Sequence, residues 1–220
     1  MGMSSLRMTP EGEKLIDENP DLRSVLDEFV LEEPDIRNLP TGKSYRGEYL
    51  GEGGHSQTYA LRGYPIAEKI IWKSPRPERP DDRVFNSFDR NLQAREFWQA
   101  STQPDSFVYV PEYYAAVEHS DGRGAILLER IGFGYSAAHL SRLVAAKWED
   151  RQKIVAEKLG VADFDTAFEQ VLQALKREKD LIEAIFRTAV ISDGGNLNIL
   201  IKWVQEDSEK VHPLIVVVDV

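Results

Sequence analysis

The chain has 220 residues and no cysteine, and its 37 acidic side chains outnumber its 27 basic ones, which gives a net charge of −10. This length suits one large domain or one domain of two lobes. An acidic chain without a long basic run argues against DNA or RNA binding, and the lack of cysteine excludes disulfides and thiolate metal sites.

The first 42 residues are acidic and interrupted by prolines. Within them, TPEGEKLIDENPDLRSVLDEFV predicts one or two short amphipathic helices that break near Pro20. We expect residues 1–42 to form an N-terminal helical extension that packs on the domain or on a protein partner. No signal-peptide pattern is present, and no apolar run reaches the roughly 18 residues that span a bilayer, so a cytoplasmic protein is expected.

Residues 43–131 follow a strand pattern with one helix inside it. YRGEYLGEGG and HSQTYAL predict two strands joined by a Gly-rich turn, and PIAEKIIWK predicts a third. The segment 83–101 predicts a helix. FVYVPEYYAAVEH and GAILLERI then predict two more strands around the turn SDGRG.

Residues 132–220 are mostly helical in pattern. SAAHLSRLVAAKW and WEDRQKIVAEKLG predict two helices, and Gly160 marks the end of the second. DFDTAFEQVLQALKREKDLIEAIFRTAV carries one apolar stripe and predicts a single long helix. NILIKWV and LIVVVD predict a hairpin near the end.

Side chains that could carry chemistry fall in a fixed order along this pattern. LGEGGHSQTY contains Gly51, Gly53 and Gly54, and such glycines let backbone N–H groups approach a phosphate. A plain hairpin turn is the alternative for this segment. Further on, IAEK places Ala67 and Lys69 on one strand face, because side chains alternate along a strand; an exposed strand lysine is the alternative.

The later candidates lie on a helix and around the last hairpin. Glu96 follows Leu92 by four residues and borders the apolar stripe of its helix, where a solvated flank position is the alternative. VISDGGNLNILI places Asp193 five residues before Asn198, between a helix and a strand. A turn explains the glycines and asparagines there but not that spacing. The last apolar strand ends at Asp219.

This order of elements and residues resembles the protein-kinase fold over residues 45–220. The resemblance implies an α+β protein with two lobes: a five-stranded antiparallel N-lobe sheet plus one helix at 43–131, and a reduced, mostly helical C-lobe at 132–220. The chain looks most like the compact bacterial kinase-like proteins of the PhoP-regulatory-network type and the antibiotic and small-molecule phosphotransferases.

The resemblance also implies the cofactors, ATP and Mg²⁺, and roles on the nucleotide side. The glycines would cover the phosphates, and Lys69 would hold the α- and β-phosphates while Glu96 pairs with it. Lys73, on the same strand face, is the substitute candidate for Lys69. The adenine ring would bind backbone groups between Glu129 and Ile131.

For the transfer step, the resemblance assigns roles to the last three candidates. Asp193 would accept or orient the proton of the acceptor hydroxyl. Asn198 and Asp219 would hold Mg²⁺, which prefers oxygen ligands. The acceptor, a protein or a small molecule, is not indicated by the sequence.

The sequence also departs from the family pattern. Ile191–Ser192 replaces the His-Arg before the catalytic Asp, and the third glycine of the loop is replaced near Ser56. Only Val220 follows Asp219, so the Asp-Phe-Gly triplet and the activation segment do not occur in this sequence. The chain is therefore interpreted either as a fragment or as a compact member with a reduced C-lobe.

Three hypotheses follow from these patterns. The first is an ATP- and Mg²⁺-dependent phosphotransferase. The second is a pseudokinase that binds nucleotide or partners without transfer, with the N-terminal helices as a partner-binding element. The third is an unrelated α+β domain whose spacings coincide with those of kinases.

Overall fold

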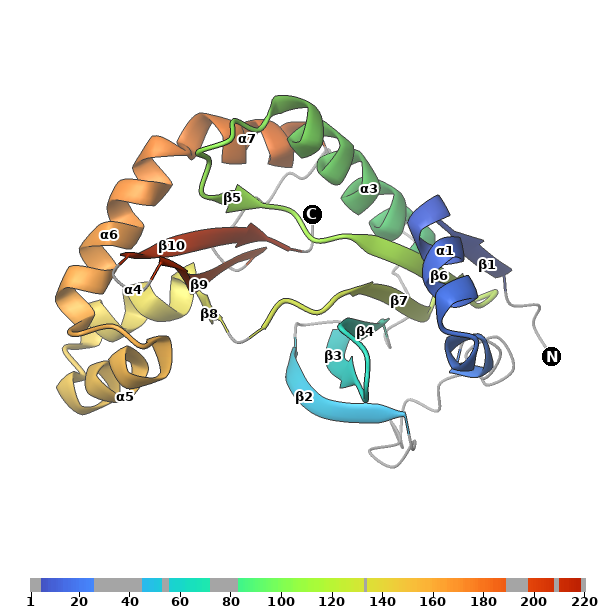
Figure 1. Ribbon diagram of the computed structural model, residues 1–220, viewed down its shortest axis with the longest axis horizontal. Helices are drawn as coiled ribbons and strands as arrows, with labels where there is room; N and C mark the ends of the chain where they lie inside the picture. Colours follow the sequence, from blue (N-terminus) through green and yellow to red (C-terminus); the bar gives the residue numbers. More distant parts are fainter. Residues whose placement is uncertain are drawn as a thin grey trace. The chain divides into compact units, whose positions relative to one another are not determined.

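A computed structural model describes residues 5–25, 45–52, 56–71, 83–132, 134–188, 198–207 and 210–218. The chain is an α+β protein with two sheets that are built from different strands (Figure 1). It divides into two compact units, one from residues 1–92 and 112–131 and the other from residues 93–111 and 132–220. Among the described residues, no helix combines the length and apolar character needed to cross a membrane.

The first unit contains a six-stranded antiparallel sheet with the order β1-β6-β7-β4-β3-β2. Its strands are β1 (Ser5–Met8), β2 (Arg46–Glu52), β3 (Ser56–Leu61), β4 (Ile66–Ile71), β6 (Tyr113–Glu118) and β7 (Gly124–Glu129). The predicted five-stranded sheet was thus one strand short. The additional strand is β1, which comes from the segment expected to be helical.

Two described stretches of the N-terminal segment are helical, as its pattern predicts. Helix α1 (Pro10–Glu18) begins after Thr9, whose hydroxyl accepts a hydrogen bond from the Gly12 N–H at 3.0 Å. Residues 21–25 are helical again after the break at Pro20. Leu22 and Val25 are buried in an apolar cluster on one face of the sheet, so these turns pack on the first unit.

Helix α3 (Val84–Ser101) covers the other face of this sheet with its first half. Val84 and Phe88 are buried there together with Ala67 and Ile126 of the sheet. The carboxylate of Glu118, at the end of β6, accepts a hydrogen bond from the Phe85 N–H at 2.8 Å and so satisfies one of the free donors of the helix start. The predicted helix over 83–101 is confirmed.

The second unit contains a four-stranded sheet with the order β5-β10-β9-β8. Its strands are β5 (Val108–Tyr109), β8 (Tyr135–Ser136), β9 (Ile199–Asp207) and β10 (Lys210–Val217). The predicted hairpin is the β9–β10 pair, while β5 joins β10 in parallel. The single strand predicted over 107–119 is wrong: β5 belongs to this sheet and β6 to the other. Pro111 lies between them and, having no N–H, cannot continue a ladder.

Besides the second half of α3, this unit contains the helices α4 (Ala137–Ala146), α5 (Glu149–Leu159), α6 (Phe164–Arg177) and α7 (Lys179–Thr188). Gly160 ends α5 in the left-handed region at φ 68°, as predicted. The single long helix predicted over 163–190 is wrong, because α6 ends at Arg177 and α7 begins at Lys179. Between them, the side chain of Glu178 is buried against β5 rather than exposed on a continuous helix face.

Candidate functional site

Lys69 lies near the middle of the first unit's sheet, on β4. It pairs in register with Thr58 of β3 and Ile126 of β7. Its same-face neighbours Ala67 and Ile71 are buried in the cluster that the first half of α3 covers. Lys69 itself is only partly exposed. The structure therefore places Lys69 on the face of the sheet that α3 covers.

The opposite face of β4 carries Glu68, which is fully buried at 0 % exposure. Arg46 of β2 binds it with two hydrogen bonds of 2.7 Å, from Nε to Oε2 and from an Nη to Oε1. Burial alone lowers the pKa of Arg46, but the hydrogen bonds and the charge of Glu68 outweigh it and raise the pKa above the ordinary arginine value. This bidentate pair links two strands that are not neighbours, since β3 lies between them.

The glycine-rich stretch lies between β2 and β3, which form the predicted hairpin. Gly51 is within β2 and pairs with Thr58, while Gly53 and Gly54 lie outside the described residues. The β2–β3 ladder is irregular, with register shifts on either side of Tyr49. Tyr49 is 48 % exposed and its ring meets that of Tyr59 edge-on at 5.6 Å between centroids. The strand that enters the glycine-rich stretch is thus less regularly paired than its neighbours.

The predicted base-binding stretch follows β7, which ends at Glu129. The N–H of Glu129 donates to the Glu112 carbonyl at 2.8 Å, and the N–H of Arg130 donates to the Pro65 carbonyl at 2.9 Å. These two N–H groups are therefore engaged within the protein and are not the donors for a base. Ile131, the third residue of this stretch, is partly exposed.

Glu96 is exposed on the second half of α3. The division between the two units falls within this helix, so Glu96 belongs to the second unit and Lys69 to the first. On the second unit, α3 packs through Ala94, Phe97 and Trp98. The Lys69–Glu96 pair therefore stays a prediction.

The predicted metal-binding residues frame the β9–β10 hairpin. Asn198 immediately precedes β9, and its carbonyl accepts a hydrogen bond of 2.9 Å from the Val218 N–H. Asp219 follows Val218 in the sequence, but Asp219 and Asp193 both lie outside the described residues, as does Lys73. Within the described part of the chain, no group of three or more His, Cys, Asp or Glu side chains is arranged to hold a metal.

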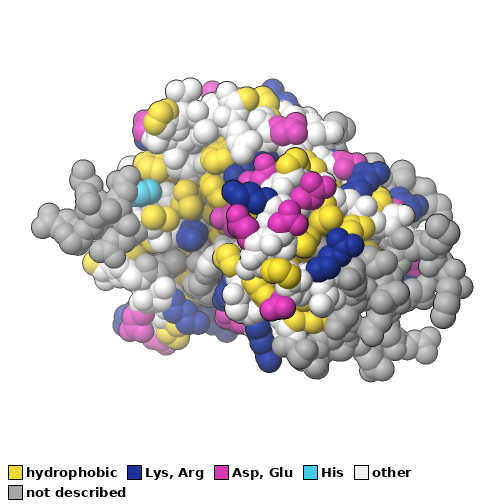
Figure 2. Space-filling view, turned by 45° about the vertical axis from the view of Figure 1, so that its right-hand side comes forward, with side chains coloured by type: hydrophobic (Ala, Val, Ile, Leu, Met, Phe, Trp, Pro, Cys, Tyr) yellow, Lys and Arg dark blue, Asp and Glu magenta, His cyan; other side chains and the backbone are white. Residues whose placement is uncertain are grey.

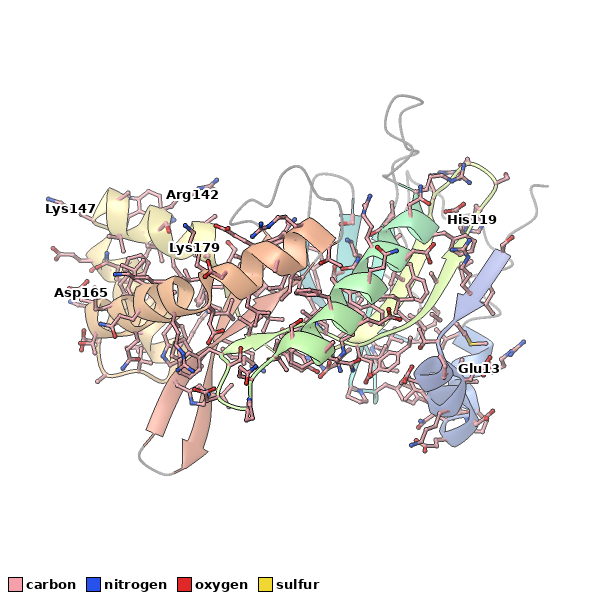
Figure 3. The ribbon with its side chains drawn as sticks, turned by 90° about the horizontal axis from the view of Figure 1, so that it is seen from above. Glu13, His119, Arg142, Lys147, Asp165 and Lys179 are labelled. Carbon is pink, nitrogen blue, oxygen red and sulfur yellow. The ribbon has the colours of Figure 1, made fainter. Side chains whose placement is uncertain are left out.

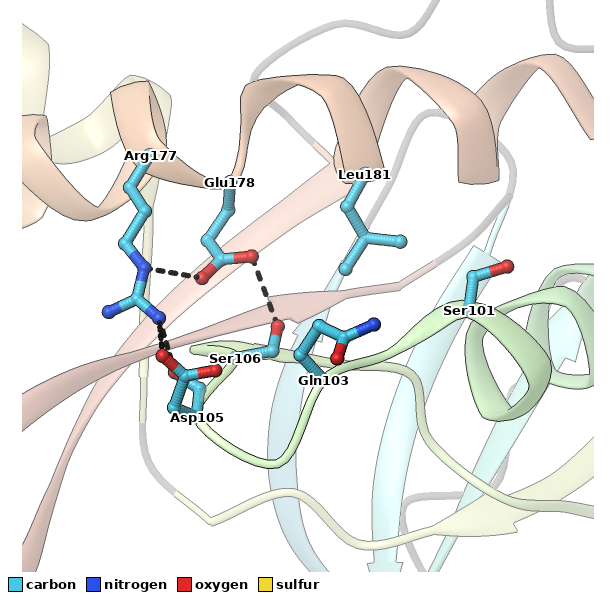
Figure 4. Close-up of a pocket in the computed structure, with 7 residues that line it drawn as sticks. All are labelled: Ser101, Gln103, Asp105, Ser106, Arg177, Glu178 and Leu181. Carbon is cyan, nitrogen blue, oxygen red and sulfur yellow. Dashed lines mark hydrogen bonds and ion pairs between the residues drawn. The ribbon is translucent and has the colours of Figure 1, made fainter.

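A shallow pocket of about 200 Å³ lies in the second unit (Figure 4). It is lined by Ser101, Gln103, Asp105, Ser106, Arg177, Glu178 and Leu181. Its charged groups bind one another: Glu178 accepts from Ser106 Oγ at 3.1 Å and lies 3.5 Å from Arg177 Nε, and Arg177 also pairs with Asp105. This network joins the α6–α7 junction to the segment before β5, and we regard it as structural.

The surface charge agrees with the composition. On the face that Figure 2 shows, acidic and basic side chains of described residues lie among one another and among apolar ones. On the helices of the second unit, Arg142 and Lys147 come from the α4 region, while Asp165 is on α6 (Figure 3). On the face shown, basic side chains are mixed with acidic ones, unlike the clustered basic surface that nucleic acids require.

Comparison with protein-family models finds no match for this sequence, and comparison with curated proteins finds none either. The kinase resemblance therefore rests on the residues themselves.

Sequence reasoning missed Arg46 and Glu68. The available signal was a glutamate inside an otherwise apolar strand, since an inward carboxylate needs a cation or several donors. The sequence offers many arginines and does not indicate which one pairs with it.

Proposed function

We propose that the chain is an ATP- and Mg²⁺-dependent phosphotransferase of the protein-kinase-like class, acting on a hydroxyl of a protein or small molecule. The observation that carries the proposal is the setting of Lys69. It lies near the middle of an antiparallel sheet, on the face that α3 covers, and its strand is next to the β2–β3 hairpin, whose sequence carries the glycines. That is the setting in which a strand lysine can bind phosphates while a helix on the same face supports it.

Nucleotide binding would use the first unit. Lys69 would bind the α- and β-phosphates, with Gly51, Gly53 and Gly54 allowing close approach of the backbone. The base would bind backbone groups between Glu129 and Ile131 other than the N–H groups of Glu129 and Arg130, which are engaged elsewhere. Glu96 would support Lys69.

Transfer would use the residues around the β9–β10 hairpin. The bond between Asn198 and Val218 brings Asn198 beside the residue that precedes Asp219, which supports a shared Mg²⁺ site made of an amide oxygen and a carboxylate. When bound, the metal would neutralise phosphate charge. Asp193 would accept the proton of the acceptor hydroxyl. At the same time, the hydroxyl oxygen of the acceptor forms a bond to the γ-phosphorus, and the bond from this phosphorus to the leaving ADP breaks.

A nucleotide-binding module without transfer activity is the second candidate. Two observations favour it: Ile191–Ser192 in place of the family's His-Arg, and the exposed position of Glu96. A pseudokinase could bind nucleotide through Lys69 without needing Asp193.

The test compares wild type with Asp193→Asn and Lys69→Met. ADP release from Mg²⁺-ATP is measured with water and the protein itself as the available acceptors, and nucleotide binding is measured by calorimetry. A general base contributes about 10²- to 10⁴-fold, so Asp193→Asn should lose ADP release on that scale and keep binding. Lys69→Met should lose both. If the wild type binds nucleotide but releases ADP no faster than Asp193→Asn does, the result favours the binding module. If the wild type does not bind nucleotide, the result contradicts both candidates.

A further inference from the structure

We propose that the buried Arg46–Glu68 ion pair positions the nucleotide site, by fixing β2 relative to Lys69. The inference rests on the proposed function. Neither residue would touch the nucleotide; both would act through the strand that enters the glycine-rich stretch.

The pair bridges β2 to β4 across the strand between them. β2 pairs only with β3 among the described strands, at the edge of the sheet. From β2, Arg46 reaches Glu68 with two bonds of 2.7 Å, and its guanidinium lies 5.5 Å from the ring centre of Tyr59 on β3. The side chains are 7 % and 0 % exposed, so solvent does not compete for these bonds. The guanidinium fork therefore specifies both the distance and the orientation of β2.

The backbone alone specifies that position poorly. The β2–β3 register shifts between Arg46 and Tyr49 and again between Tyr49 and Gly51. β2 carries two glycines and its middle, residues 48–50, is exposed, so few buried side chains fix its register. In such a strand, one residue of slip moves the side chains to the other face. A buried ion pair adds little net stability over an apolar pair, and its best-attested use is to select one arrangement among several.

Sequence adjacency joins the pair to the site. Glu68 and Lys69 are consecutive on β4 and project to opposite faces of the sheet. A displacement of β2 against Glu68 is therefore also a displacement of Gly51 against Lys69. If both contact the same phosphates, loosening the pair costs nucleotide affinity, because the site must then be ordered on binding.

The experiment replaces both charges together, with the double variant Arg46→Met, Glu68→Leu. Removing one charge would leave the other buried and unpaired, whereas an apolar pair of similar size is often neutral for stability. The control is Arg7→Met, Asp89→Leu, which removes an ion pair between β1 and α3 whose side chains are 49 % and 46 % exposed. A third variant, Arg46→Lys, keeps the positive charge but loses the two-pronged guanidinium bond to Glu68. This variant tests the proposal if the double variant does not fold.

Two quantities are measured on folded protein: hydrogen exchange of the β2 amides without ligand, and the dissociation constant for Mg²⁺-ATP. We expect the double variant to exchange its β2 amides faster than wild type while β4 stays protected. Its dissociation constant should rise about tenfold, equivalent to the loss of about 1.4 kcal/mol of pre-organisation. Arg46→Lys should lie between the double variant and wild type, and the control should match wild type.

The outcomes separate the two claims. Unchanged exchange in β2, or faster exchange with an unchanged dissociation constant, would overturn the positioning role and leave the proposed function intact. If wild type does not bind Mg²⁺-ATP, the proposed function fails, and the positioning role fails with it.

Discussion

At the scale of single residues, three carboxylates are buried among the residues that the structure describes, and each one joins two elements. Glu68 binds Arg46 and links β4 to β2, Glu118 binds the start of α3, and Glu178 binds the segment before β5. A carboxylate is costly to bury unless donors surround it. Each of these side chains therefore fixes a specific arrangement, which a pattern of apolar residues alone leaves open.

We expect Glu178→Ala to lower the free energy of unfolding by about 1–3 kcal/mol, because the part-buried N–H of Phe107 loses its acceptor. Urea unfolding measures the change. Glu169→Ala, an exposed position on α6, is the control and should stay within about 0.5 kcal/mol of wild type. Equal effects of the two substitutions would show that Glu178 has no tethering role.

Asp163 makes the stability of α6 depend on pH. It is the N-cap of this helix and accepts a hydrogen bond of 2.7 Å from the Thr166 N–H, which lowers the pKa of Asp163 below its ordinary value of 3.8. Because the folded-state pKa is the lower one, the stabilisation is present above pH 3.8 and disappears as the pH falls through the folded-state pKa. Asp163→Asn keeps an acceptor at the cap without the charge. Between about pH 5 and pH 2, the range in which an aspartate titrates, the free energy of unfolding of this variant should therefore fall less than that of wild type. Parallel pH profiles would contradict this assignment.

At the scale of elements, the predictions succeeded where one local signal decides the structure. Helix α3 and the Gly160 end of α5 follow from periodicity and from a residue that tolerates positive φ. The predictions failed for elements whose structure depends on tertiary contacts. The break at Glu178 depends on a partner about 70 residues away in sequence, and β1 is four residues long, too short for its alternation to be distinguished from a loop.

Gly12 controls how closely α1 approaches the sheet. A Cβ at this position would lie 2.1 Å from the Tyr114 carbonyl oxygen of β6. We expect Gly12→Ala to destabilise the protein by about 1–3 kcal/mol through overpacking, although alanine favours an isolated helix. Thermal unfolding checks the sign, with Glu11→Ala at an exposed neighbour as the control. A stabilised Gly12→Ala variant would mean that α1 does not make this contact.

At the scale of the whole molecule, the α+β class, the order of most elements and the strand that bears Lys69 could be predicted from the sequence. The face that Lys69 occupies follows from alternation once β4 is recognised. The Arg46–Glu68 pair could not be predicted, because it joins residues 22 positions apart across an intervening strand. The pairing of Lys69 with Glu96, and the roles of Asp193 and Asp219, stay predictions.

The central claim is that this chain binds Mg²⁺-ATP through Lys69. The most direct measurement is thermal unfolding with ATP, with and without magnesium, on wild type, Lys69→Met and the control Lys153→Met, an exposed lysine of α5. Ligand at 100 times its dissociation constant stabilises by about 2.7 kcal/mol, or about 5–10 °C for a chain of this size. We predict a magnesium-dependent shift of that size in wild type and in the control, and none in Lys69→Met. The absence of a shift in wild type at millimolar ATP, or an equal shift in Lys69→Met, would contradict the account.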